Sequence, residues 1–173
     1  EVKIYRKIIQ NSDFRAHIAP HTLEIASMFA VLSRLEPTAK CDLMTKVKIY
    51  NGEEVIEKGR TKKIDLQELR HETKREGMDG ISTRLITKAL DNALSDNVDG
   101  RCINPITVRE ALVAMVREAE LSDDQRKRYL EFLQDTIHKE YLEILEKEIT
   151  KAFVYAYEEQ AEALFQNYLD HAE

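Results

Sequence analysis

The chain has 173 residues, enough for one sizeable core or two small ones, and 43% of them are hydrophobic, as in ordinary globular proteins. Its formal net charge is −6 and 34% of its residues are charged, so its average surface repels polyanions. A nucleic-acid role would need a local basic patch, and no dominant one is present. Cys41 and Cys102 form no CxxC pair, which suits a reducing compartment better than a secreted disulfide scaffold.

The sequence contains no secretion signal and no apolar run long enough to cross a bilayer, so we expect a cytoplasmic protein without a membrane role. The chain begins at Glu1 without a methionine, and it stops within a helical pattern. We therefore expect it to be a piece of a longer protein.

The first elements are predicted to be two helices. Apolar residues at helical spacing cover Val2 to Ile9, and the pattern ends at Asn11. A second helix is predicted after Pro20, a good residue for a first helical turn, and Pro37 closes it. Small residues are frequent on its apolar face, which predicts close packing against a neighbouring helix.

The segment "KVKIYNGEEVIE" carries the strongest strand signal of the chain. Its two short runs, Val47–Tyr50 and Glu53–Ile56, flank Asn51-Gly52, a dipeptide that tolerates the positive φ angles of a tight turn. A β-hairpin is therefore predicted at residues 46–57.

A helix, a short loop and another helix are predicted next. The first helix covers Leu66 to about Arg75, and the glycines at positions 77 and 80 interrupt it. Ser82 or Thr83 then opens a helix from Arg84 to about Leu94.

Turn-forming residues crowd the segment "SDNVDGRCINP", which reads as a linker, and Pro105 starts a helix through about Glu118. Ser122 is predicted to cap the following helix, with Gln125 as its capping-box partner.

From Asp123 the apolar positions keep a helical period, with a change of phase near Glu148. The pattern fits one very long helix or two joined there. We favour two helices packed antiparallel, because a lone helix would leave its apolar stripe in water; a dimeric coiled coil is the competing explanation. The predicted fold is mainly α: a helical bundle with one hairpin over residues 1–98, and a helical C-terminal region with long helices over residues 99–173.

Most kinds of chemical site find no support. His17 and His21 have the i, i+4 spacing of helical metal sites, but His17 precedes the helix, and no further ligand lies nearby in sequence. Neither cysteine lies beside a histidine, and there is no GxSxG motif for a nucleophilic serine. The loops that bind nucleotide phosphates in P-loop proteins and kinases are also absent, so the chain alone is predicted not to transfer a phosphoryl group.

Arg84 is the main candidate for a functional site. The N-terminus of a helix offers unpaired backbone N–H groups and a partial positive charge, and an arginine there adds a planar cation. The three features together predict an anion site, with phosphate as the obvious anion. The alternative is a solvated arginine, or one paired with Asp79 or Glu76.

Three segments, "IAPHTLEIASMFAVLSRLEP", "REGMDGISTR" and the helical tail that ends in "YLD", resemble the bacterial PrkA-type serine protein kinases. These are cytoplasmic proteins with an AAA+ ATPase module ahead of a helical C-terminal region. The resemblance covers nearly the whole chain and is most specific at "GMDGISTR". It implies that residues 1–98 form the helical lid of the AAA+ module and that residues 99–173 begin the C-terminal region.

The resemblance also implies a role for the "GISTR" segment. In AAA+ proteins an arginine at the start of a lid helix, called sensor 2, reaches the phosphates of the nucleotide bound on the core. Arg84 matches that position, with Ser82 and Thr83 beside it. The parent protein would then bind ATP and Mg and phosphorylate a protein substrate. This chain would be its non-catalytic part, would contact the AAA+ core of the same protein, and is a candidate for self-association.

Two alternatives from other classes stay open. The helix pair from Leu66 to Leu94 can be drawn as a DNA-binding helix-turn-helix, with the 46–57 hairpin as a wing. Its second helix carries Arg84 and Lys88 but also two aspartates, Asp91 and Asp96, so it attracts phosphate weakly. A purely structural helical oligomerisation module is the other alternative, and it is compatible with the lid.

Overall fold

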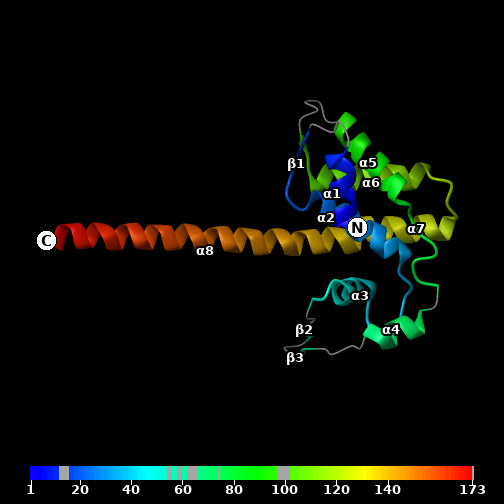
Figure 1. Ribbon diagram of the computed structural model, residues 1–173, viewed down its shortest axis with the longest axis horizontal. Helices are drawn as coiled ribbons and strands as arrows, with labels where there is room; N and C mark the ends of the chain where they lie inside the picture. Colours follow the sequence, from blue (N-terminus) through cyan, green and yellow to red (C-terminus); the bar gives the residue numbers. More distant parts are fainter. Residues whose placement is uncertain are drawn as a thin grey trace. The chain divides into compact units, whose positions relative to one another are not determined.

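The computed structural model describes residues 1–11, 16–53, 56–57, 60–61, 66–73, 75–96 and 102–172. The chain divides into two compact units, Glu1–Ile137 and His138–Glu173, which are considered separately below (Figure 1). Helices dominate both units, and strands are confined to two-residue segments. The expected mainly α fold with a small β element is confirmed.

The elements follow in chain order. They are α1 (Val2–Gln10), β1 (His17–Ile18), α2 (Thr22–Arg34), α3 (Leu43–Tyr50), β2 (Ile56–Glu57), β3 (Arg60–Thr61), α4 (Leu66–Glu72), α5 (Thr83–Ser95), β4 (Cys102–Ile103), α6 (Pro105–Glu118), α7 (Asp123–Glu131), the π-helical segment η1 (Phe132–Thr136) and α8 (Ile137–Ala172).

Helix α2 lies at the centre of the first unit, in contact with α1, α3, α5, α6 and η1. Ala26, Phe29 and Ala30 on this helix are fully buried. Small side chains let neighbouring backbones approach closely, so the expectation of tight packing around this helix is confirmed. Helix α5 packs mainly on α6 and also on α2, which makes α1, α2, α5 and α6 one bundle (Figure 1).

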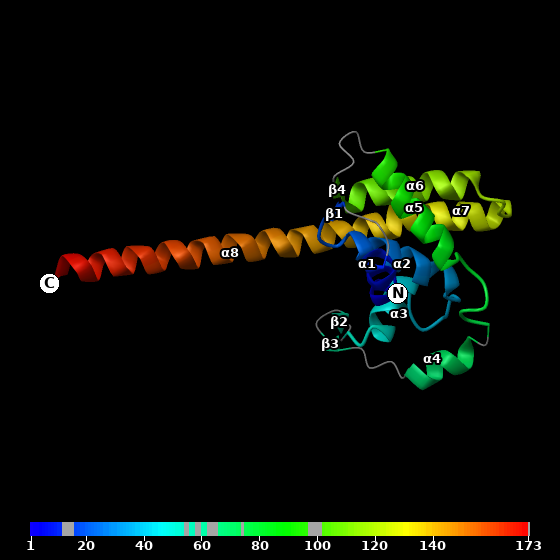
Figure 2. The same cartoon turned by 45° about the horizontal axis from the view of Figure 1, so that its top comes forward.

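A short parallel strand pair joins two distant parts of this bundle. His17 pairs with Cys102 and Ile18 with Ile103, so the entry to α2 lies beside the entry to α6 (Figure 2). The Ala19 backbone N–H extends the pairing by donating to the Ile103 carbonyl at 2.9 Å. The linker before α6 was expected, but residues 97–101 of it lie outside the described part.

The hairpin predicted at residues 46–57 is wrong. Residues 43–50 form helix α3, whose N-terminus is capped by the Asp42 carboxylate accepting from the Thr45 N–H at 3.0 Å. Gly52, at φ 81°, ends this helix instead of turning a hairpin. The Gly52 N–H donates to the Ile49 carbonyl and the Glu53 N–H to the Lys48 carbonyl, both at 3.0 Å. These two bonds define a Schellman C-cap, which favours the same Asn-Gly dipeptide as a tight turn.

A hairpin does occur, but later in the chain. Strand β2 pairs antiparallel with β3, with Ile56 opposite Thr61 and Glu57 opposite Arg60. The β-branched residues of 47–50 suggested a strand, but strand propensity depends strongly on context. Here the tertiary contacts described below favour a helix.

Several predicted helix starts are confirmed. Ser82 caps α5, and Ser122 and Gln125 form the expected capping box at α7. Pro105 is the first residue of α6, and Asn104 before it forms a second capping box with Thr107. Local side-chain chemistry therefore sets these boundaries.

The second unit consists of helix α8, which continues unbroken through Glu148. The antiparallel pair of helices favoured from the sequence is therefore wrong. No glycine or proline follows Pro105, so nothing in this segment ends a helix, and a change in apolar phase does not need a break. Large apolar side chains along α8 are exposed, among them Ile149, Phe153 and Tyr157. No helix in the described ranges is both long and apolar enough to span a membrane.

The first unit includes α6 and α7, so it extends past the division expected at residues 98 and 99. That division concerns the domains of a parent protein, and it stays a prediction.

Candidate functional site

The loop that leads to Arg84 is seated directly on the last turn of α2. Gly80 has φ 119°, a conformation that L side chains rarely adopt. A Cβ atom there would lie 2.6 Å from Cγ of Arg34 and 2.9 Å from both the carbonyl oxygen and Oγ of Ser33. Only glycine allows this close approach of the loop backbone to α2.

Ile81, the next residue, is held at both of its backbone groups. Its N–H donates to Oγ of Ser33 at 2.9 Å, and its carbonyl accepts from Nη2 of Arg34, also at 2.9 Å. Its side chain is buried, and the Gly77 N–H donates to the Arg34 carbonyl at 3.0 Å. The C-terminal turn of α2 therefore fixes both ends of the segment 77–81.

Helix α5 begins directly after this segment. Ser82 is the N-cap and its hydroxyl accepts from the Leu85 N–H at 3.4 Å, so this hydroxyl belongs to the cap. Thr83 is the first helical residue and is partly exposed, whereas Arg84 is exposed. Within the described residues, neither the Arg84 side chain nor the backbone N–H groups of Thr83 and Arg84 have a hydrogen-bond acceptor. The first turn of α5 thus presents two N–H groups and a guanidinium to an incoming anion.

The carboxylates considered as partners of Arg84 are engaged elsewhere. Asp79 accepts from Nη2 of Arg75 at 3.4 Å, in an exposed ion pair. Glu76 is bound by Lys46, as described next. Neither is paired with Arg84, so the salt-bridged alternative for Arg84 is not found in the described structure.

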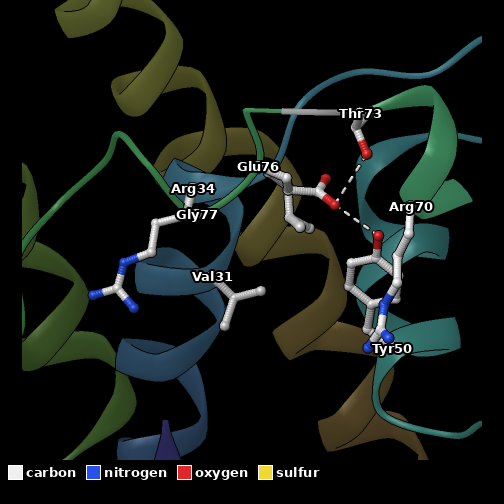
Figure 3. A pocket seen from close by; sticks show the side chains of 8 residues that line it. Val31, Arg34, Tyr50, Arg70, Thr73, Glu76 and Gly77 are labelled. Atoms are coloured by element: carbon white, nitrogen blue, oxygen red, sulfur yellow. Dashed lines mark hydrogen bonds between the residues drawn. The ribbon is translucent and has the colours of Figure 1, made fainter.

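Glu76 is the centre of a polar cluster between α2, α3 and α4. Its carboxylate accepts from the Tyr50 hydroxyl at 2.6 Å, the Thr73 hydroxyl at 3.1 Å and the Glu36 N–H at 3.1 Å, and it forms an ion pair with Lys46. Figure 3 shows the Glu76 carboxylate directed toward the Tyr50 and Thr73 hydroxyls. Three donors therefore surround one carboxylate, together with the Thr73 hydroxyl, whose single proton also has the Leu69 carbonyl as an acceptor at 2.9 Å.

Lys46 is fully buried, which is rare for a lysine. Its ammonium also donates to the Glu36 carbonyl at 3.0 Å and lies 3.4 Å from the Thr73 hydroxyl, so its three protons have acceptors. Lys46 and Tyr50 are four residues apart, hence on one face of α3. The helical conformation of residues 43–50 is what lets both reach Glu76.

The cluster shifts the pKa values of its members. Burial alone would raise the pKa of the Glu76 carboxyl, but the hydrogen bonds from Lys46 and Tyr50 outweigh it and hold the pKa below the ordinary 4.5. Burial, together with the hydrogen bond to Glu76, raises the pKa of Tyr50 to about 12. Glu76 is thus ionised and Tyr50 neutral at physiological pH.

A cavity of about 320 Å³ adjoins the cluster. Its lining residues are Val31, Arg34, Leu35, Tyr50, Arg70, Thr73, Glu76 and Gly77. Arg34 lies on the far side of Val31 from Tyr50 in Figure 3, with its guanidinium directed away from Glu76. Protein donors already engage both oxygens of the Glu76 carboxylate, which favours a structural role for the cluster.

The other candidates do not converge. His17 lies exposed in β1, and the ring of His21 pairs with Glu24. No group of three or more metal-ligating side chains occurs in the ranges that the structure describes. The wing of the helix-turn-helix alternative does not lie at residues 46–57, because residues 43–50 are helical, and α5 packs on α6 and α2.

Sequence reasoning located Arg84 and its loop but missed the contacts that hold the loop. Ser33 and Arg34 precede Ile81 by more than forty residues, and no local pattern links them. The buried Lys46 and its partner Glu76 were missed for the same reason. One available signal was Asp42, an N-cap residue type directly before residues 43–50.

Comparison with known proteins gives two family matches that together cover nearly the whole chain. The sequence model of the PrkA AAA domain matches residues 1–42, and that of the PrkA serine protein kinase C-terminal domain matches residues 44–173. Helices α1 and α2 belong to the first range, whereas α5 and α6 belong to the second, so the bundle is built from both. No solved structure matches the chain.

Curated relatives agree with these matches. The chain is 38% identical over 178 residues to the "ATP-dependent protease PrkA" of Bacillus subtilis. It is 32% identical over 175 residues to the "Serine/threonine kinase YeaG" of Escherichia coli K12. Each alignment covers 100% of this chain but 27% of the relative. Since the C-terminal domain model matches most of the chain and the AAA domain model matches its first residues, the chain belongs to the PrkA family.

Proposed function

We propose that this chain is the non-catalytic lid and C-terminal regulatory part of a cytoplasmic, ATP-dependent serine protein kinase of the PrkA type. In this proposal Arg84 contacts the phosphates of ATP, bound with Mg on the AAA+ core of the same protein. The lid would report the state of the nucleotide by moving with it. The protein substrate would be bound and phosphorylated outside this chain.

The observation that carries the proposal is the environment of Arg84. It is exposed on the first turn of α5, beside two N–H groups that have no acceptor in the described structure, while the nearby carboxylates are bound to other residues. Helix α5 also belongs to the same bundle as α1 and α2, which the AAA domain model matches. A packed helical bundle with an exposed arginine at one edge is suited to bind an anion on a neighbouring domain.

The test uses a full-length protein that contains this chain. A charge-assisted hydrogen bond contributes roughly 1.5–3 kcal/mol, so Arg84→Ala is expected to lower nucleotide affinity or ATP turnover by about 10- to 150-fold. Arg84→Lys should restore only part of this, because lysine keeps the charge but loses the planar pair of donors. The thermal unfolding of both variants should match that of the wild type. Unchanged affinity and turnover in Arg84→Ala would overturn the proposal.

A second candidate activity for the whole protein is ATP-dependent proteolysis, which the name of the Bacillus subtilis relative favours. The two activities separate in one experiment. Full-length protein is incubated with a protein substrate and γ-labelled ATP; transfer of label supports the kinase, and ATP-dependent cleavage supports the protease. The nucleotide role of Arg84 is compatible with either activity.

A purely structural oligomerisation role is the remaining candidate, and the exposed apolar side chains of α8 favour it. When several large apolar side chains lie exposed along one helix, a partner normally covers them. In this role α8 would pair with α8 of a second copy. Light scattering of the chain, beside a variant with Phe153 and Tyr157 changed to glutamate, tests it: a dimer that the variant abolishes is expected, and a monomeric wild type contradicts it.

A further inference from the structure

The close contact between the loop 77–81 and the end of α2 has a consequence for the site on α5. Two backbone groups of Ile81 are bound by two consecutive α2 residues, Ser33 and Arg34. Ile81 is followed directly by the N-cap Ser82, and Arg84 lies on the first turn beyond it. Only Ser82 and Thr83 therefore separate the residue held by α2 from Arg84 along the backbone.

We infer that Ser33 is a positioning residue for Arg84: its hydroxyl fixes the Ile81 backbone and so sets where the first turn of α5 presents the arginine. This inference rests on the proposed function, because it concerns the presentation of Arg84 to nucleotide phosphates. It adds a residue from the AAA-matched range, 1–42, to a site whose arginine lies in the C-terminal range.

The hydrogen bonding of Ser33 supports a specific role. The residue is buried, and its hydroxyl both accepts from the Ile81 N–H at 2.9 Å and donates to the Ala30 carbonyl at 2.8 Å. The Ile81 N–H is directed at a single atom, since no other acceptor for it is found among the described residues. Because buried N–H groups need a partner, loss of the hydroxyl would let the loop move to find another one.

The steric fit at Gly80 restricts the loop in the opposite direction. Gly80 lies so close to Ser33 that a Cβ atom would overlap its Oγ and carbonyl oxygen. The loop cannot approach α2 further, and the Ser33 hydroxyl prevents it from moving away. The steric contact at Gly80 and the hydrogen bond at Ile81 together define one distance between the loop and α2, and so one position for Ile81.

Helix α2 offers a matched control. Ser27 is also buried on α2, but its hydroxyl has no hydrogen-bond partner in the described structure. Ser27→Ala and Ser33→Ala thus make the same chemical change on the same helix, and only Ser33→Ala removes a contact to the loop. Ser33→Thr keeps the hydroxyl and serves as the conservative variant.

The experiment measures binding of a fluorescent ATP analogue, with Mg²⁺, to full-length protein carrying Ser33→Ala, Ser33→Thr, Ser27→Ala, Arg84→Ala or Ser33→Ala/Arg84→Ala. Since one neutral hydrogen bond is lost, Ser33→Ala should weaken binding by about 2- to 10-fold, less than Arg84→Ala does. Ser33→Thr and Ser27→Ala should bind within about twofold of wild type. In the Arg84→Ala background, Ser33→Ala should have no further effect, because two residues that act through one contact are not additive.

The outcomes separate this inference from the proposed function. If Arg84→Ala weakens binding but Ser33→Ala does not, the positioning role is overturned and the nucleotide role of Arg84 stands. If Ser33→Ala weakens binding equally in both backgrounds, Ser33 acts through something other than Arg84, and the inference again fails. If Arg84→Ala itself binds like wild type, both fail together. Thermal melts of all variants, recorded in parallel, show that each is folded at the assay temperature.

Discussion

Replacing Lys46 with methionine tests whether the cluster around Glu76 holds α3 on the bundle. The substitution keeps most of the side-chain volume and removes the only cation bound to the Glu76 carboxylate in the described structure. Lys46 is fully buried, and the side chain of Glu76 is 14% exposed, so little water can replace the lost ammonium. Removing one partner of a buried ion pair typically lowers the free energy of unfolding by about 3–5 kcal/mol.

The contacts that remain place the expected cost near the lower end of that range. Glu76 still accepts from Tyr50, Thr73 and the Glu36 N–H in the variant. We therefore expect a loss of about 3 kcal/mol, which at an m-value of about 2 kcal/mol/M is a midpoint shift of about 1.5 M urea. Circular dichroism follows the unfolding of residues 1–173, and hydrogen exchange of residues 66–82 reports whether the loss begins at this cluster.

Two further variants make the measurement decisive. Lys40→Met removes an exposed ion pair with Glu68, in which the side chains are 38% and 63% exposed, and should cost no more than about 1 kcal/mol. Lys46→Met/Glu76→Gln should recover much of the loss, because it leaves no uncompensated charge. The reasoning is refuted if Lys46→Met costs no more than Lys40→Met, or if the effects of the two cluster substitutions simply add.

Three other predictions concern a loop, a hydroxyl and a cap. Gly80→Ala should lower the free energy of unfolding by more than about 1 kcal/mol, and by clearly more than Gly77→Ala does. Both positions have positive φ, but an added Cβ at position 77 has nothing within 4 Å, whereas one at position 80 would overlap its neighbours. Equal urea midpoints for the two variants would contradict this. The pKa of Tyr50 is raised to about 12, so its contribution to stability is complete below pH 10 and is lost as pH rises through 12. Tyr50→Phe should therefore lose less stability than the wild type over that interval. Parallel curves of unfolding free energy against pH for the two proteins would exclude the Tyr50 contribution. Asn104→Ala removes a side-chain oxygen that accepts from two N–H groups of α6 and should cost about 1 kcal/mol in the same urea assay, an expectation that an unchanged midpoint would disprove.

The parts of the fold that follow from neighbouring residues were predictable. Ser122 was predicted as a helix cap, and Ser82 was one of two candidates for the next cap, because an N-cap hydroxyl acts on N–H groups two or three residues away. The same local reading failed at residues 43–50, where Lys46 and Tyr50 reach Glu76 in a different part of the chain. Propensity alone pointed to a strand there, and the distant partner decided otherwise.

The candidate site divides in the same way. A glycine-containing loop before a helix and an arginine on the first turn of that helix are sequence features, so Arg84 could be predicted as a candidate. The hydrogen bonds from Ser33 and Arg34 to Ile81 could not be predicted, because they join residues more than forty positions apart. The role of Arg84 toward a nucleotide stays a prediction, since the contact it would make lies on another domain.

The hydrogen bond between the Gly77 N–H and the Arg34 carbonyl, 3.0 Å long, has a consequence for how this fold can vary. It brings the two ends of residues 35–76 side by side, so that stretch leaves the bundle and returns at one place. Lys46 and Glu76 both lie within this stretch, so its removal would not leave either charge without its partner. We therefore expect that a short turn between residues 34 and 77 could close the bundle, and that loops of other lengths could replace this stretch with little change in the cost of loop closure.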